Sequence, residues 1–117
     1  MSDTLKLAVC QLRTELDRAE TMEKAERMIR EAAGQGADIA VLPEMFNCPY
    51  SGKYFKKFAA EGHEDSVREM ASWARENQIV LIGGSVPETE EGRLYNTCFV
   101  FNEKGEQKIG RASCRER

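Results

Sequence analysis

Residues 37–44 read ADIAVLPE, a short and nearly all-apolar run that ends in a proline and a carboxylate. Dense aliphatic side chains of this kind predict a short strand over residues 37–42. Pro43 has no backbone N–H to donate to a neighbouring strand, so the strand ends there. We therefore expect the carboxylate of Glu44 to lie at the carboxyl end of a strand.

The residues before this run predict a first strand and a helix. Residues 5–12, LKLAVCQL, are rich enough in aliphatic side chains for a strand that is buried on both faces. Asp17 and Glu20 have the spacing of a capping box, and apolar residues then recur every three or four positions. This pattern predicts an amphipathic helix over residues 17–33, closed by Gly34 or Gly36. Strand, helix and strand make one right-handed βαβ unit.

The rest of the chain predicts further strands and a second helix. Residues 46–62 show no clear period and contain a short aromatic face, which favours a functional loop. We then expect these elements: a helix over 65–77, a third strand over 79–87, a turn at 90–93, a fourth strand over 95–102, and a hairpin turn at 103–106 into a fifth strand. The predicted fold class is α/β, with the first three strands adjacent and both helices on one face of the sheet.

The composition excludes several classes of protein. The chain has 117 residues, 17 basic and 20 acidic, and the charges are interleaved, which argues against a nucleic-acid or anionic-membrane surface. Hydrophobic residues make up 41% of the chain, too many for wholesale disorder. The longest apolar run, residues 39–42, is far too short to span a membrane or to form a signal-peptide core. The sequence therefore favours a cytoplasmic location.

The cysteines and the single histidine do not predict a metal or redox site. No cysteine pair has Cys-x-x-Cys spacing, and the four cysteines are expected to be free thiols. His63 stands in a polar stretch and is expected at the surface or at a helix start. The glycines of residues 83–85, GGS, follow a strand but lead to neither a lysine nor a helix, so they do not form a phosphate loop.

Residues 109–117, IGRASCRER, have no apolar period and no natural stop. This segment resembles the translation of a common sequencing adapter, and we interpret it as a non-native read-through tail. The alternative is a genuine basic tail that binds a partner. On the first interpretation the domain covers residues 1–108, and Cys114 carries no mechanism.

Glu44 is the strongest candidate for a catalytic group. It stands at the carboxyl end of a strand, which is where open α/β sheets bind ligands. Apolar strand residues before it and Phe46 and Tyr50 after it would make the carboxyl a better general base. The alternative is a glutamate that caps the next turn or pairs with a surface lysine, and the spacing alone does not decide between them.

Several motifs together resemble the opening of a carbon-nitrogen hydrolase of the nitrilase superfamily. They are LAVCQL at residues 7–12, ADIAVLPE at 37–44, LIGGSVP at 81–87 and YNT at 95–97. Within this superfamily, residues 45–55, MFNCPYSGKYF, are most similar to the omega-amidase branch. The resemblance implies a four-layer α-β-β-α sandwich and amide hydrolysis by a Glu, Lys and Cys triad without a cofactor or metal. Glu44 matches the glutamate of that triad. Phe46 and Tyr50 are candidate substrate-binding residues, and plain packing within the loop is the alternative for both.

The sequence also departs from the family pattern. The place of the family's lysine is taken by residues 112–114, ASC, and Lys108 comes too early to substitute for it. The family's cysteine lies beyond residue 117, although Cys48 is a rival candidate because it follows Glu44 in the same loop. We therefore expect a truncated part of the sandwich that is inactive alone. The missing second sheet would leave an apolar face of the first sheet exposed.

The sequence thus predicts the N-terminal portion of an omega-amidase-like enzyme. The implied substrate is the terminal amide of a small dicarboxylate monoamide such as 2-oxoglutaramate. The alternatives are an N-carbamoyl or aliphatic amidase of the same superfamily, or a noncatalytic α/β fragment that binds a ligand or a partner. The parent enzyme is expected to be a homo-oligomer without a nucleic-acid or membrane partner.

Overall fold

The computed structural model describes residues 4–109. In chain order their elements are β1 (Leu7–Val9), α1 (Arg18–Gly34), β2 (Ile39–Val41), α2 (Gly52–Asn77), β3 (Val80–Ile82), β4 (Val86–Glu90), β5 (Arg93–Thr97), β6 (Val100–Phe101) and β7 (Gln107–Ile109). Neither helix in this part of the chain is long and apolar enough to cross a membrane. Residues 110–117 of the proposed tail lie outside the described residues, so its assignment as non-native stays a prediction.

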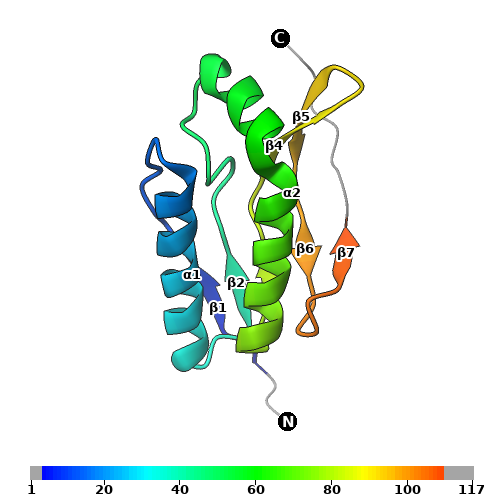
Figure 1. The fold of residues 1–117 in the computed structure, drawn as a ribbon. Coiled ribbons are helices and arrows are strands. Elements are labelled where there is room, and N and C mark those ends of the chain that lie inside the picture. The colour runs from blue at the N-terminus through cyan, green and yellow to red at the C-terminus, as the bar shows by residue number, and fades with distance from the viewer. Residues whose placement is uncertain (1–3, 110–117) are drawn as a thin grey trace.

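Five of these strands form one sheet in the order β1-β2-β3-β6-β7, and β4 and β5 form a separate antiparallel ribbon. β1, β2 and β3 are parallel neighbours, with Ala8 beside Ala40 and Ala40 beside Leu81. Both helices cover the same face of this sheet (Figure 1). The predicted α/β class, the adjacent first three strands and the one-sided helices are therefore confirmed.

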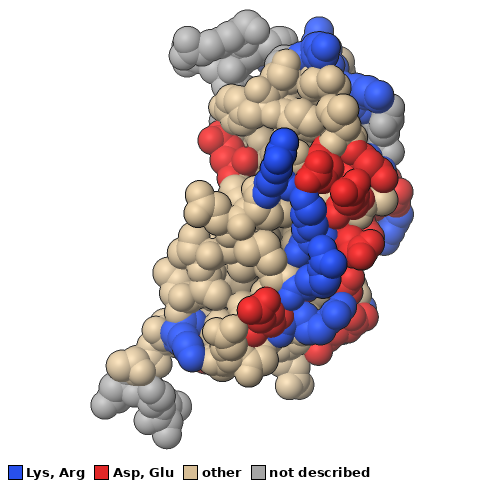
Figure 2. All heavy atoms as spheres, turned by 90° about the vertical axis from the view of Figure 1, so that its left-hand side faces the viewer, with Lys and Arg blue, Asp and Glu red and all other residues tan. Residues whose placement is uncertain are grey.

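The other face of the sheet exposes apolar side chains. Leu7 and Val9 of β1 are 57% and 74% exposed, whereas Ala40 and Leu81 lie in the core beneath the helices. Charged side chains gather over the helical side of the molecule, and the opposite side is largely free of them (Figure 2). This exposed face was expected, but the prediction that the first strand is buried on both faces is wrong. β1 is an edge strand, and the helices cover only one of its faces.

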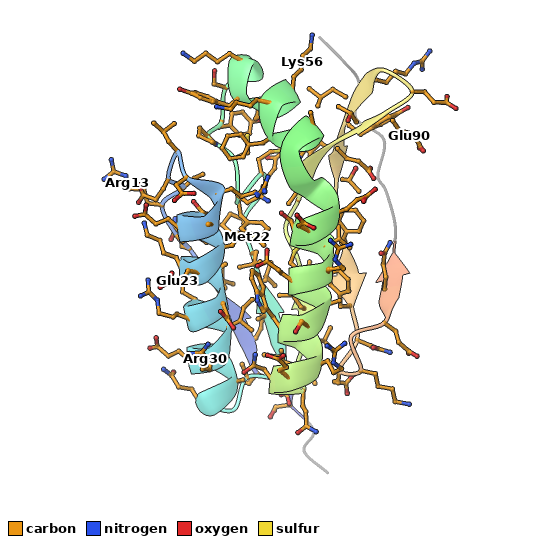
Figure 3. The ribbon with its side chains drawn as sticks, viewed as in Figure 1. Arg13, Met22, Glu23, Arg30, Lys56 and Glu90 are labelled. Atoms are coloured by element: carbon orange, nitrogen blue, oxygen red, sulfur yellow. The ribbon has the colours of Figure 1, made fainter. Side chains whose placement is uncertain are left out.

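α1 forms where the sequence predicts it, for local reasons. Asp17 caps the helix by accepting a hydrogen bond from the backbone N–H of Ala19 at 3.1 Å. Met22 points from α1 toward α2 and is buried, whereas Glu23 and Arg30 point away from the sheet (Figure 3). The amphipathic period that predicted the helix therefore also selects the face that packs.

α2 differs from the prediction because it begins at Gly52 and not at residue 65. The predicted loop over residues 46–62 is thus helical from residue 52 onward. The buried positions of α2 repeat at helical spacing along its length and are Phe58, Ala59, Ser66, Met70, Trp73 and Ala74. This packing overrides the weak helical tendency of the glycines at 52 and 62. His63, expected at the surface or at a helix start, lies inside this helix.

The strands predicted over residues 79–87 and 95–102 are each divided between the sheet and the ribbon. The first breaks between β3 and β4, where Gly84 has a φ of +60°. A strand cannot continue through positive φ, so the chain turns there. The second breaks at residues 98–99, between β5 and β6. Both predicted turns are confirmed: residues 90–93 join β4 to β5, and residues 103–106 join β6 to β7.

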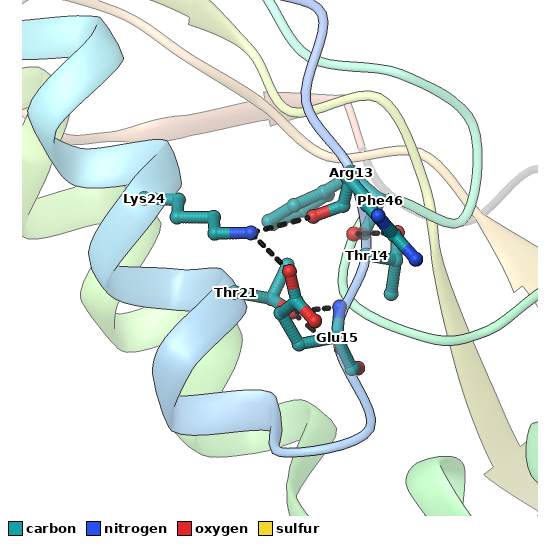
Figure 4. Close-up of polar contacts among 6 residues, drawn as sticks. All are labelled: Arg13, Thr14, Glu15, Thr21, Lys24 and Phe46. Carbon is teal, nitrogen blue, oxygen red and sulfur yellow. Dashed lines mark hydrogen bonds and ion pairs between the residues drawn. The ribbon is translucent and has the colours of Figure 1, made fainter.

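Side-chain hydrogen bonds tie the segment between β1 and α1 to its neighbours (Figure 4). The buried Thr21 hydroxyl accepts from the backbone N–H of Glu15 at 2.8 Å. Lys24 pairs with Glu15, and its hydrogen bond lowers the pKa of that carboxyl from the ordinary value. Thr14 donates to the carbonyl oxygen of Phe46 at 2.8 Å. These contacts connect α1 to the segment that follows β2.

We expect Thr21→Val to loosen this segment. Valine keeps the shape of threonine but leaves the N–H of Glu15 without its acceptor, which typically costs about 1–2 kcal/mol. Hydrogen exchange at the Glu15 amide should then become about tenfold faster, as mass spectrometry of the peptide that contains it can show. Thr21→Ser keeps the hydroxyl and serves as the control. Unchanged exchange in the valine variant would contradict this role of Thr21.

Candidate functional site

Glu44 follows β2 after Leu42 and Pro43 and therefore stands at the carboxyl ends of the parallel strands β1, β2 and β3. This is the edge at which open α/β sheets bind ligands. The sequence predicted apolar side chains around the Glu44 carboxylate. In the described part of the chain Glu44 is instead exposed. The physical reason is that Phe46, expected beside it, turns into the core.

The backbone on both sides of Glu44 is held by one residue, Ser85. The N–H of Met45 donates to the Ser85 hydroxyl at 2.8 Å, and the N–H of Phe46 donates to the Ser85 carbonyl oxygen at 3.2 Å. The N–H of Ser85 donates in turn to the carbonyl oxygen of Pro43 at 3.3 Å. These three hydrogen bonds fix the chain immediately before and after Glu44.

Two residues next to these hydrogen bonds, Gly84 and Met45, have unusual backbone conformations. Gly84 has a φ of +60°, and a Cβ added to it would lie 2.0 Å from the carbonyl oxygen of Pro43. Only glycine therefore fits there. Met45 has a φ of +50°, which is uncommon for a residue with a side chain. Such conformations persist only where the surroundings impose them, and they gather at functional sites.

The side chain of Glu44 has a partner 52 residues further along the chain. Nδ2 of Asn96 donates a hydrogen bond to Oε2 of Glu44 at 2.7 Å. Asn96 lies on β5, opposite Pro87 of β4. Ser85 and the ribbon that follows it therefore both hold Glu44. Ser85 contacts the backbone around it, and Asn96 of the ribbon contacts its carboxylate.

The two predicted substrate-binding residues lie in different surroundings. Phe46 is 1% exposed and belongs to the hydrophobic core, so its ring does not line an open surface in this chain. Tyr50 is 74% exposed, and its ring meets that of Phe55 edge-on with 5.3 Å between centroids. Their roles in binding substrate stay predictions.

A hollow of about 490 Å³ lies between α1 and α2, and it is separate from Glu44 and its partners. Its lining is mostly charged and consists of Arg18, Ala19, Met22, Asp65, Arg68, Glu69 and Ser72. Asp65 and Arg68 pair with each other on the surface of α2. Neither Glu44 nor Asn96 lines this hollow, so we place the candidate site at the strand ends, where a fixed carboxylate is present.

The cysteines of the described part are free thiols. Cys48 is 1% exposed, and burial raises the pKa of its thiol to about 12. Burial also raises the pKa of Cys10 and Cys98. A nucleophilic cysteine needs its thiolate, so these surroundings disfavour the rival in which Cys48 attacks the substrate. Cys114 lies outside the described residues. Among the described side chains, no group of three or more His, Cys, Asp and Glu could hold a metal ion.

The buried thiol of Cys48 gives a testable result. With a pKa of about 12, only about 10⁻⁴ of it is thiolate at pH 8, against about a quarter for an ordinary thiol near 8.5. We expect iodoacetamide to alkylate Cys48 about 10³-fold more slowly in the native protein than in urea, as peptide mass spectrometry can show. Rapid native labelling of Cys48 would contradict this assignment.

Sequence reasoning identified Glu44 but assigned no role to Ser85 or Asn96. Asn96 entered only as part of a family motif, because no local pattern relates it to a residue 52 positions earlier. A usable signal did exist for Ser85. Paired glycines directly after a strand often mark the close approach of another backbone segment, and here that segment is Leu42 and Pro43, immediately before Glu44.

Known proteins match most of the chain. The sequence profile of the carbon-nitrogen hydrolase family matches residues 6–114. Omega-amidase NIT2 of Homo sapiens is 44% identical over 102 residues, which are 87% of this chain and 37% of that protein. Omega-amidase NIT2 of Danio rerio is 43% identical over 100 residues, 86% of this chain and 36% of that protein.

A solved structure shows the same fold. Nit3 of Saccharomyces cerevisiae, a member of branch 10 of the nitrilase superfamily, superposes with a TM-score of 0.84 at 31% identity. The match covers 92% of this chain and 43% of that one. The chain thus spans well under half the length of the relatives it matches. Because the family profile covers nearly all of its residues, the chain belongs to the carbon-nitrogen hydrolase family.

Proposed function

We propose that this chain supplies the general base of an omega-amidase-like enzyme, and that Glu44 is that base. The observation that carries the proposal is the Glu44 carboxylate itself, exposed at the carboxyl ends of three parallel strands and held through Ser85 and Asn96. The 43–44% identity to proteins named omega-amidases supports the branch. The lysine and the cysteine of the triad lie in the continuation of the polypeptide beyond residue 108.

The proposed reaction uses Glu44 twice. The carboxylate takes the proton of the cysteine thiol, and the thiolate attacks the amide carbon while the lysine ammonium stabilises the oxyanion. The tetrahedral intermediate expels ammonia, to which the protonated Glu44 returns the proton, and a thioester remains. Glu44 then takes a proton from water, which attacks the thioester, and the second tetrahedral intermediate collapses to the carboxylic acid. The protonated Glu44 returns this proton to the leaving thiolate, which restores the thiol.

The proposed substrates are small dicarboxylate monoamides such as 2-oxoglutaramate. The segment after Glu44 favours this class, because residues 45–55 are similar to the omega-amidase branch. Tyr50 is exposed on this segment and is the better placed of the two candidate binding residues. The cytoplasmic location and the homo-oligomeric state of the whole enzyme remain part of the proposal.

Ammonia release by the full-length protein, encoded by the gene continued past codon 108, tests this function. Three substrates separate the candidates: 2-oxoglutaramate, an N-carbamoyl amino acid and a simple aliphatic amide. The proposal predicts the highest kcat/KM for 2-oxoglutaramate. A preference for either other substrate would move the protein to another branch of the superfamily. Release by the 117-residue chain alone would contradict the assignment of the nucleophile to the continuation.

A further inference from the structure

We propose that Asn96 is a positioning residue for Glu44, a role that rests on the proposed function of Glu44 as general base. Its Nδ2 donates to Oε2 of Glu44 at 2.7 Å. A hydrogen bond from an amide to a carboxylate is charge-assisted and directional. It holds the carboxyl group in one orientation and leaves the second oxygen, Oε1, to accept the proton from the nucleophile.

The orientation of the Asn96 amide is determined by its surroundings. The NH₂ group must face Glu44, because the amide oxygen would meet a carboxylate oxygen that cannot donate. The amide oxygen Oδ1 is buried and has no hydrogen-bond partner among the described residues. The side chain therefore keeps a buried acceptor unpaired while its donor contacts Glu44.

The β4–β5 ribbon and the residue directly before it hold the two ends of this hydrogen bond. Asn96 pairs with Pro87 across β4 and β5, and its neighbour Thr97 is fully buried and donates to Glu88 at 2.7 Å. Ser85, which immediately precedes β4, holds the backbone around Glu44. The carboxylate and its donor are therefore both held by one continuous segment, residues 85–97. Little conformational freedom is lost when the contact between them forms.

A contact of this kind should act on the rate of the chemical step rather than on substrate affinity. Asn96 reaches the reaction only through Glu44, and a base that leaves its productive orientation transfers the proton more slowly. Loss of the contact should thus lower kcat and leave KM nearly unchanged. A merely structural residue would instead change the stability of the protein, whichever side chain stands at position 44.

A double-mutant cycle on the full-length protein tests this role by ammonia release from 2-oxoglutaramate. We expect Asn96→Ala to lower kcat about tenfold when Glu44 is present. In the Glu44→Gln background the same change should lower kcat by less than about twofold, because no base remains to be positioned. Asn96→Asp is nearly isosteric and removes the donor without leaving a cavity, so it should also lower kcat at least about tenfold. This variant keeps the test possible if the alanine variant fails to fold.

Asn102→Ala is the matched control, because Nδ2 of Asn102 also donates to a carboxylate, that of Glu106, at 2.8 Å. It should lower the thermal midpoint but leave kcat unchanged. An Asn96 effect of equal size in both backgrounds, or wild-type turnover in a folded Asn96 variant, would overturn the inference. A wild-type protein that releases no ammonia would overturn the proposed function itself, so the two failures are distinguishable.

Discussion

Gly84→Ala should prevent the full-length protein from folding stably. The new Cβ would lie 2.0 Å from the carbonyl oxygen of Pro43 and 2.5 Å from that of Leu42, and both atoms belong to the backbone. The φ of +60° adds about 1–2 kcal/mol of strain for any residue with a side chain. We expect a loss of at least about 3 kcal/mol in the free energy of unfolding, measured by urea denaturation.

Gly34→Ala is the matched control for this prediction. Gly34 ends α1, and a Cβ added to it would meet no other part of the described chain within 4 Å. Alanine favours a helix by up to about 1 kcal/mol over glycine, so this variant should be as stable as the wild type or more so. A Gly84→Ala protein with wild-type stability would mean that the close approach to Pro43 does not exist.

The βαβ unit could be predicted from the sequence because its signals are local. The aliphatic run of residues 37–42 and the helical period before it require no knowledge of distant contacts. Pro43 ends the strand by lacking a donor, which places Glu44 correctly. Asp17 caps α1 for an equally local reason.

The errors arise where distant packing decides the structure. α2 extends back to Gly52 because Phe58 and Ala59 pack in the protein interior, although the local sequence favours a loop. The third strand breaks at Gly84 because the backbone of Pro43 passes there. The residues before Gly84 carry no sign of which segment approaches it.

The candidate site was likewise predicted only in part. Glu44 follows from its place at a strand end, but its hydrogen-bond partners come from another part of the chain. Ser85 and Asn96 are brought to it by the turn at Gly84 and by the ribbon of β4 and β5. Phe46 was expected beside the carboxylate. Met45 has a positive φ, so the backbone turns there and does not continue as an extended chain, and Phe46 packs in the core.

Glu44→Gln should lower amidase turnover of the full-length protein at least about 10²-fold, as measured by ammonia release. This is the low end of what a general base contributes. Glutamine is nearly isosteric and can still accept a hydrogen bond from Asn96, so the local structure should persist. It cannot take a proton from a thiol at neutral pH. The change therefore removes the proposed chemistry and little else.

Glu23→Gln controls for the loss of a negative charge. Glu23 is exposed on α1 and points away from the sheet (Figure 3), so its replacement should leave turnover unchanged. Circular dichroism should show that both variants are folded. Equal thermal midpoints would assign any difference in rate to the chemistry at position 44.

Ammonia release from 2-oxoglutaramate by the wild-type and Glu44→Gln full-length proteins, at equal folded concentration and neutral pH, is the most direct test of Glu44 as the general base. The wild type should turn over, and the variant should be slower by at least about 10²-fold. A folded Glu44→Gln protein that releases ammonia near the wild-type rate would show that another group takes the proton.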